Sequence, residues 1–154
     1  MKLAEALALR ADAVRRVEQL RTRIAASARY QEGEEPAEDA GQLLAESAAV
    51  LDDLESLVRR INRTNAAAAL DGGGTLTDAL ARRDVLRLRH SVVTAAADAA
   101  AGQYGAARQL RSELRMLSAL PVAELRSRAD ALAREIREVD VRIQRANWEV
   151  DLLD

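Results

Sequence analysis

The sequence predicts an all-α protein, an antiparallel four-helix bundle built from helical hairpins with long helices. The first observation is that apolar residues recur every three or four positions along four long stretches, the spacing of helices with one apolar face. The second is the composition, 49% hydrophobic but only 2% aromatic and without phenylalanine, which favours closely packed helices. The third is the length of 154 residues, which fits one domain with a sizeable core. We therefore expect a single helical domain over residues 1–154, with coiled-coil-like contacts between its helices.

The first helix is expected over residues 3–29. Its apolar face is formed by small and aliphatic residues at helical spacing, namely Leu3, Leu7, Val14, Val17, Leu20, Ile24 and Ala28. The pattern stops at Tyr30. A glycine, a proline and a run of acidic residues follow, and they predict a loop over residues 30–40.

The acidic loop leaves two interpretations open. Its carboxylates belong to Glu32, Glu34, Glu35, Glu38 and Asp39. Carboxylates on a flexible backbone could bind a hard cation, although these residues do not follow the spacing of a calcium-binding loop. Alternatively, the loop is solvated, caps the next helix through its last two acidic residues, or pairs with arginines. The loop is therefore retained as a candidate metal site.

A second helix is expected over residues 41–69. Its face is formed by Leu43, Ser47, Val50, Leu54, Leu57 and Ile61, with Leu44, Leu51 and Val58 alongside. Continuing the same steps leads to Asn62 and Asn65. A buried amide without a hydrogen-bond partner costs about 1 to 3 kcal/mol. We therefore expect both asparagines to face polar partners.

A short turn separates the second helix from a third, which is expected over residues 75–101. Asp71 and three consecutive glycines end the second helix, and Thr75 with Asp78 approximates a capping box at the start of the third. So short a turn makes the two helices antiparallel neighbours.

The third helix is expected to contact neighbours on several of its faces. One apolar strip holds Ala81, Val85, Leu88 and Val92, and a second holds Ala79, Leu86 and Val93. Arg83, Arg87 and His90 share a further face. Because the hairpin is antiparallel, Asn62 and Asn65 are expected to lie near Arg83, Asp84 and Arg87. The result would be a polar layer inside the bundle.

The sequence does not decide the secondary structure of residues 102–120. Leu110, Ser112, Leu114 and Met116 alternate with charged residues, as in a strand, yet the segment also contains many helix formers. An extended β arm and a helix therefore both stay open.

Pro121 then begins a last helix over residues 121–152, with apolar residues at unbroken three-four spacing. Trp148, near its end, is expected to pack in the core or against a partner subunit.

Charge and residue counts narrow the classes of function. A formal net charge of -2 argues against nucleic acid as a partner, and the absence of cysteine excludes disulfides and thiolate metal sites. One histidine is too few for a di-iron bundle, which needs Glu-x-x-His pairs. The first residues lack the apolar run of a signal peptide, and no window approaches the roughly 18 apolar residues of a membrane span. We therefore expect a cytoplasmic protein without a cofactor.

Five sequence runs resemble a small bacterial all-helical family of unknown function, some of whose members are labelled septicolysin after a cytolysin. The runs are QEGEEPAED (31–39), RRINRTN (59–65), TLTDALARRD (75–84), LRLRH (86–90) and IQRANW (143–148). The similarity covers nearly the whole chain. It implies a soluble, oligomeric helical protein, with a region 102–120 richer in β structure. It supplies no activity, because the family has no catalytic residues to carry over.

Three functional hypotheses follow. The first is a homo-oligomeric structural or interaction module whose polar layer fixes register and stoichiometry. The second is a binding protein or enzyme for a small phosphate or carboxylate ligand, with a candidate site formed by Asn62, Arg63, Asn65, Arg83, Asp84, Arg87 and His90. The third is a membrane-active, cytolysin-like protein. We favour the first, because the sequence shows neither a recognisable catalytic nucleophile with its base nor a set of metal ligands. An enzyme is therefore not expected.

Overall fold

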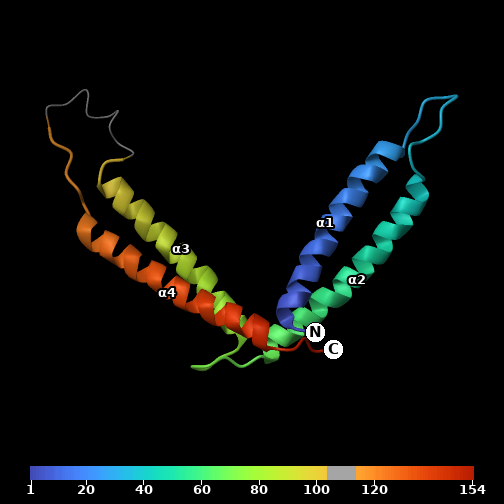
Figure 1. Ribbon diagram of the computed structural model, residues 1–154. Coiled ribbons are helices and arrows are strands. Elements are labelled where there is room, and N and C mark those ends of the chain that lie inside the picture. The colour runs from blue at the N-terminus through green and yellow to red at the C-terminus, as the bar shows by residue number, and fades with distance from the viewer. Residues whose placement is uncertain (104–113) are drawn as a thin grey trace. The chain divides into compact units, whose positions relative to one another are not determined.

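The computed structural model describes residues 1–103 and 114–154. These residues form four long helices and no strand (Figure 1), which are α1 (Leu3–Ser27), α2 (Ala40–Ala67), α3 (Leu76–Ala100) and α4 (Val122–Glu149). The predicted all-α fold is therefore confirmed. Within this part of the chain, no helix is both long and apolar enough to cross a membrane.

The chain divides into two compact units. The first comprises Met1–Ala68 together with Ala146–Asp154, and the second comprises Ala69–Arg145. The first unit contains the hairpin of α1 and α2, and the second contains α3 with most of α4. The expectation of a single domain stays a prediction.

In the first unit, α1 and α2 lie side by side (Figure 1). Leu3, Ala6 and Leu20 of α1 and Leu43 and Ile61 of α2 are buried. All but Ala6 belong to the apolar stripes that the three-four spacing predicts, because such residues fall on one side of a helix. Val14 of the predicted stripe is exposed instead. Burial of these aliphatic side chains holds the hairpin together.

The beginning and the end of the described chain pair with each other in this first unit. Lys2 and Asp151 form an isolated antiparallel bridge. The amide of Leu3 donates to the carbonyl of Val150 at 3.0 Å, and the amide of Leu152 donates to the carbonyl of Met1 at 2.9 Å. Leu152 is buried beside them. These contacts fix residues 150–152 against the start of α1.

Two turn signals in the sequence determine how the second unit begins. Gly72, Gly73 and Gly74 all have positive φ, between 81° and 97°, a conformation that residues with a Cβ rarely adopt. Thr75 then caps α3, because its side chain accepts from the amide of Asp78 while the Asp78 carboxylate accepts from the amide of Thr75 at 2.7 Å. The predicted capping box is confirmed, and helix formation begins at Leu76.

The core of the second unit lies between α3 and α4. Its buried apolar residues are Leu76, Ala79, Leu86, Val93 and Ala97 on α3 and Ala129, Leu132, Val139 and Ile143 on α4. Only one of the two apolar strips predicted for α3 is therefore buried in this hairpin.

The segment predicted as an arm is described only in part. Residues 104–113 lie outside the described residues. Residues 114–120 form neither a helix nor a strand, so the structure does not show an extended β arm. The choice between helix and arm for the remaining residues stays open.

The structure corrects the expectation for Trp148. Its side chain is exposed, so the residue does not pack in the core. The reason is helical spacing. Ile143, Ala146 and Val150 lie on the side of the chain that faces the core, and the same spacing places Trp148 on the opposite side.

Candidate functional site

The structure places the predicted polar residues in two different units. Asn62, Arg63 and Asn65 lie on α2 in the first unit. Arg83, Asp84, Arg87 and His90 lie on α3 in the second. The single polar layer that would combine the two sets stays a prediction.

The buried polar residue of α2 is Thr64, not the predicted asparagines. Asn62 is exposed and Asn65 is half-buried, whereas Thr64 is fully enclosed. The Thr64 hydroxyl donates to the carbonyl of Arg60 at 2.8 Å and accepts from the amide of Leu153 at 3.0 Å. The inward face of α2 continues from Ile61 by a step of three residues to Thr64. The sequence pattern alone did not distinguish this step from a step of four, which leads to Asn65.

Arginines of α2 border an open hollow of about 550 Å³ in the first unit. Arg60 binds the side chain of Asp154 at 2.9 Å and the carbonyl of Leu153 at 3.1 Å. Arg63 donates to the main-chain oxygen of Asp154 at 3.1 Å. Arg59 pairs with Glu55 at 3.4 Å. The guanidinium groups are thus engaged with acceptors of the protein itself.

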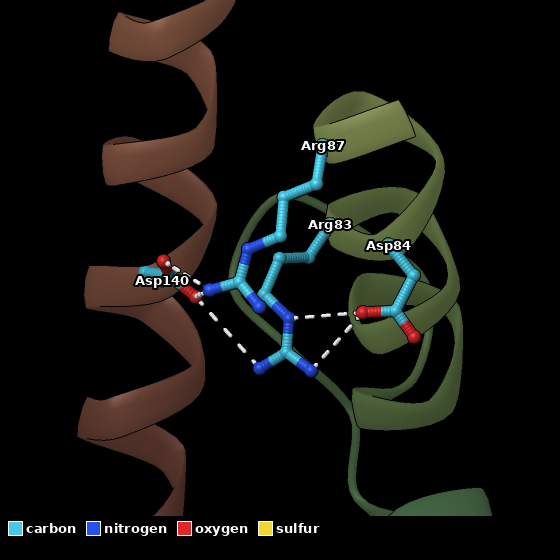
Figure 2. A network of polar contacts seen from close by, with 4 residues as sticks. All are labelled: Arg83, Asp84, Arg87 and Asp140. Atoms are coloured by element: carbon cyan, nitrogen blue, oxygen red, sulfur yellow. Dashed lines mark hydrogen bonds and ion pairs between the residues drawn. The ribbon is translucent and has the colours of Figure 1, made fainter. Parts of the chain in front are cut away.

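Figure 2 shows the polar contacts of the second unit, where α3 faces α4. Arg87 Nη2 lies 3.1 Å from Asp140 Oδ2, and Arg83 Nη1 lies 3.8 Å from Asp140 Oδ1. Arg83 also donates from Nε and Nη2 to Asp84 Oδ1, both at 3.2 Å. We call these four residues the Asp140 cluster.

The Asp140 cluster joins two cations to two anions, so its formal charges balance. The side chain of Arg83 is only 22% exposed and that of Asp140 only 33% exposed. A partly buried guanidinium is stabilised by a carboxylate placed on the facing helix. The arrangement is therefore suited to aligning α3 with α4. His90 lies half-buried further along α3.

Sequence reasoning found both arginines of this cluster but missed Asp140. The residue is polar and lies next to the buried Val139, so nothing in the sequence of α4 distinguishes it from other flanking carboxylates. The missing information was the register between α3 and α4, which depends on the long connection between them. Arg82–Glu135 at 3.1 Å and Asp98–Arg126 at 2.6 Å show this register to be antiparallel.

The acidic loop makes contacts with its own unit. The Arg23 guanidinium donates to the Glu38 carboxylate, and this hydrogen bond holds the pKa of Glu38 below its ordinary value. Asp39 caps α2 by accepting from the amide of Gln42 at 3.0 Å. Glu32, Glu34 and Glu35 are exposed. Among the described residues, which include the whole loop, no group of three or more acidic or histidine side chains is arranged to hold a metal ion.

The most distinctive surface feature of the second unit is an apolar stripe along α3. Its members are exposed and recur at steps of four and three: Ala81, Val85, Leu88, Val92, Ala95 and Ala99. We call this set the α3 stripe. Leu88 is 67% exposed and Val92 is 69% exposed. The first four members form one of the two apolar strips predicted for this helix, while the other strip is buried against α4.

These features define the class as an all-α protein of helical hairpins, with an ion-pair cluster between α3 and α4 and an apolar stripe on one helix. The chain belongs to a family of unknown function (DUF6847), whose model matches residues 10–152. It is also similar to the crystal structure of a functionally unknown conserved protein from Corynebacterium diphtheriae, with 39% sequence identity and a TM-score of 0.91 over 99% of each chain. No curated protein matches the chain.

The descriptions of the family and of the similar structure name no activity. Neither carries the septicolysin label, so the resemblance is supported only as far as a helical family of unknown function.

Proposed function

We propose that this protein is a self-associating interaction module, and that its working surface is the α3 stripe. The observation that carries the proposal is the exposure of Val85, Leu88 and Val92 in one line on a long helix. Single exposed apolar residues are normal, but a contiguous apolar patch marks an interaction site. Burial of such a stripe against a second copy would remove its apolar surface from water.

The Asp140 cluster has a supporting role in this proposal. It links α3 to α4 through Asp140. By helical spacing, Arg83 and Arg87 lie on a different side of α3 from the stripe. By fixing the alignment of the two helices, the cluster presents the stripe on a rigid element. Rigid presentation reduces the free energy that is otherwise lost in ordering a surface during association.

The contacts give less support to an anion-binding site. The three arginines of the candidate site already have acceptors within the protein. Arg63 donates to the main-chain oxygen of Asp154, and Arg83 and Arg87 contact the carboxylate of Asp140. An incoming phosphate would have to compete with these internal partners. Membrane action receives no support from the exposed charged surfaces, which mix both signs, whereas a membrane-surface helix needs a cationic polar face.

The decisive test replaces one residue of the stripe by a charge. We expect Leu88→Glu to abolish self-association, because the carboxylate would have to be buried in the interface. The matched control is Val141→Glu on α4, because Val141 is also 67% exposed but lies outside the stripe. The measurement is native mass by analytical ultracentrifugation, with circular dichroism to verify that both variants keep their helices.

The expected result is a wild-type mass above that of the 16.8 kDa chain, a single-chain mass for Leu88→Glu, and a wild-type mass for the control. A wild-type protein that stays a single chain at about 100 µM would overturn the proposal, since a dimer weaker than this has little stability.

A further inference from the structure

We infer that the α3 stripe pairs with the same stripe of a second copy as a parallel, two-stranded coiled coil. This inference rests on the proposed self-association and adds the occupant, the number of strands and their direction. It is carried by three independent features of α3, which are the spacing of the stripe, the shapes of its apolar residues and the signs of the charges on its flanks.

The spacing of the stripe is that of a coiled-coil seam. In a heptad written a to g, the apolar positions are a and d, separated by alternating steps of three and four residues. Val85, Val92 and Ala99 then occupy a, and Ala81, Leu88 and Ala95 occupy d. The register holds without a break from residue 81 to residue 99, a length of roughly 27 Å.

This seam is separate from the one that already packs against α4. The inward-facing line of α3 holds Ala79, Arg83, Leu86, His90, Val93 and Ala97, all buried or half-buried, whereas every member of the stripe is exposed. The helix therefore carries two heptad lines on different faces. One is covered by α4, and the other is available to a second chain.

The residue shapes favour two strands. β-Branched residues at a with leucine at d favour parallel dimers over trimers and tetramers. The centre of the stripe has Val85 and Val92 at a and Leu88 at d. The alanines at both ends allow the two backbones to approach closely.

The flanking charges select the parallel direction. The e positions carry Arg82 and Arg89, and the g positions carry Asp84 and Asp98. In a parallel pair, each g residue meets the e residue of the next heptad on the other chain, which places Asp84 beside Arg89 of the partner subunit. The two-fold symmetry repeats this ion pair on the other side of the seam.

An antiparallel pair would bring the wrong charges together. In that direction e positions face e positions and g positions face g positions. Arg89 would then meet Arg89 of the partner subunit, and Asp84 would meet Asp98, which already pairs with Arg126 of its own chain. Like charges placed opposite each other disfavour a pairing. The side chain of Asp84 is 64% exposed even though it contacts Arg83, so it remains accessible to a partner.

Cysteine cross-linking tests the direction directly, because the chain has no cysteine of its own. Ala81→Cys and Ala95→Cys keep the valines and the leucine of the stripe. In a parallel pair, each d residue lies opposite its own copy, so each variant alone should form a disulfide-linked dimer. Ala131→Cys, at an exposed position of α4, is the control and should form no disulfide-linked dimer after the same mild oxidation.

An antiparallel seam would give a different result. In that direction a positions face d positions, so residue 81 would lie opposite residue 99 of the other copy, and Ala81→Cys would cross-link only when mixed with Ala99→Cys. That result, or no cross-linking of either variant when the wild-type protein is dimeric by ultracentrifugation, overturns the parallel coiled coil and leaves self-association standing. A monomeric wild-type protein overturns both.

Charge exchange tests the ion pair between Asp84 and Arg89. Asp84→Arg alone and Arg89→Asp alone should each weaken the homodimer roughly tenfold, because each places like charges across both sides of the seam. An equimolar mixture should recover wild-type affinity as heterodimers. If Asp84→Arg instead strengthened self-association, the arginine would be meeting Asp98 in an antiparallel pair, and the inference would be wrong.

Discussion

At the scale of single residues, the chain shows that a charged side chain can occupy a core-facing position of a helix when the facing helix supplies its partner. Arg83 lies on the inward line of α3, with its charge compensated by Asp140 and Asp84. The arginine was identifiable from its position in the pattern. Its partner was not, since a helical pattern reveals the face of a residue but not the register across a hairpin.

Replacement of Asp140 should reveal how much the partly buried Asp140 cluster contributes to the free energy of unfolding. We expect Asp140→Asn to lower the free energy of unfolding by about 1 to 2 kcal/mol, between the values for exposed and fully buried ion pairs. The matched control is Glu135→Gln, which removes the partner of Arg82 on the same pair of helices. That ion pair is more exposed, at 60% and 45%, so its loss should cost less than about 1 kcal/mol. Urea denaturation measures both, and equal losses would show that burial of Arg83 is unimportant.

At the scale of the elements, periodicity and capping residues were sufficient to locate the helices. The predicted helix over residues 75–101 compares with an observed α3 of Leu76–Ala100, and its start follows from the Thr75 and Asp78 pair. The apolar spacing did not predict the buried side of a helix where two continuations of its apolar face fitted helical spacing equally well. On α2 it could not decide whether the face continued to Thr64 or to Asn62 and Asn65, because that choice depends on which side the neighbouring segments cover.

The capping box makes a prediction for α3. Thr75→Ala should lower the free energy of unfolding by about 1 kcal/mol, because the amide of Asp78 loses its acceptor. Thr77→Ala, at an exposed position in the same first turn, should be close to neutral. Thermal unfolding followed by circular dichroism compares the two. Equal effects would mean that the hydroxyl of Thr75 does not act as a cap.

The same box makes stability depend on pH. Hydrogen bonds from Thr75, first of all from its amide, hold the pKa of Asp78 below its ordinary value of 3.8. A carboxyl group with a lowered pKa stabilises the fold above its unfolded-state pKa, and this stability is lost as the pH falls through the folded-state pKa. The stability advantage of the wild type over Asp78→Asn should therefore be constant near neutral pH and shrink below pH 3.8. A difference that stays the same down to pH 2 would contradict this account.

At the scale of the whole molecule, the sequence was enough for the fold class and for the length of each helix, because both depend on local patterns. The spatial relation between the two sets of polar residues depends on long-range packing, which cannot be read from the spacing pattern of one sequence. The identity of the partner that covers the α3 stripe cannot be read from that pattern either. A stripe such as Val85, Leu88 and Val92 can face a neighbour in the same chain or in another, and only its exposure indicates the second.

Self-association makes a prediction for the stability of the molecule. A partner that binds only the folded state stabilises it by mass action, so the unfolding midpoint should rise by a few degrees when the protein concentration is raised tenfold. Leu88→Glu should show no such rise. The measurement is differential scanning calorimetry at several concentrations, and a wild-type midpoint independent of concentration would argue against association through the folded state.

The two heptad lines of α3 also limit how this helix can change in evolution. An ordinary surface helix has one constrained face and can drift elsewhere, but here one line packs on α4 and another is proposed to pack on a second copy. Position c is not free either, because it holds Arg87, which pairs with Asp140 of α4. In a library of all single substitutions, α3 should therefore tolerate fewer polar replacements than α1.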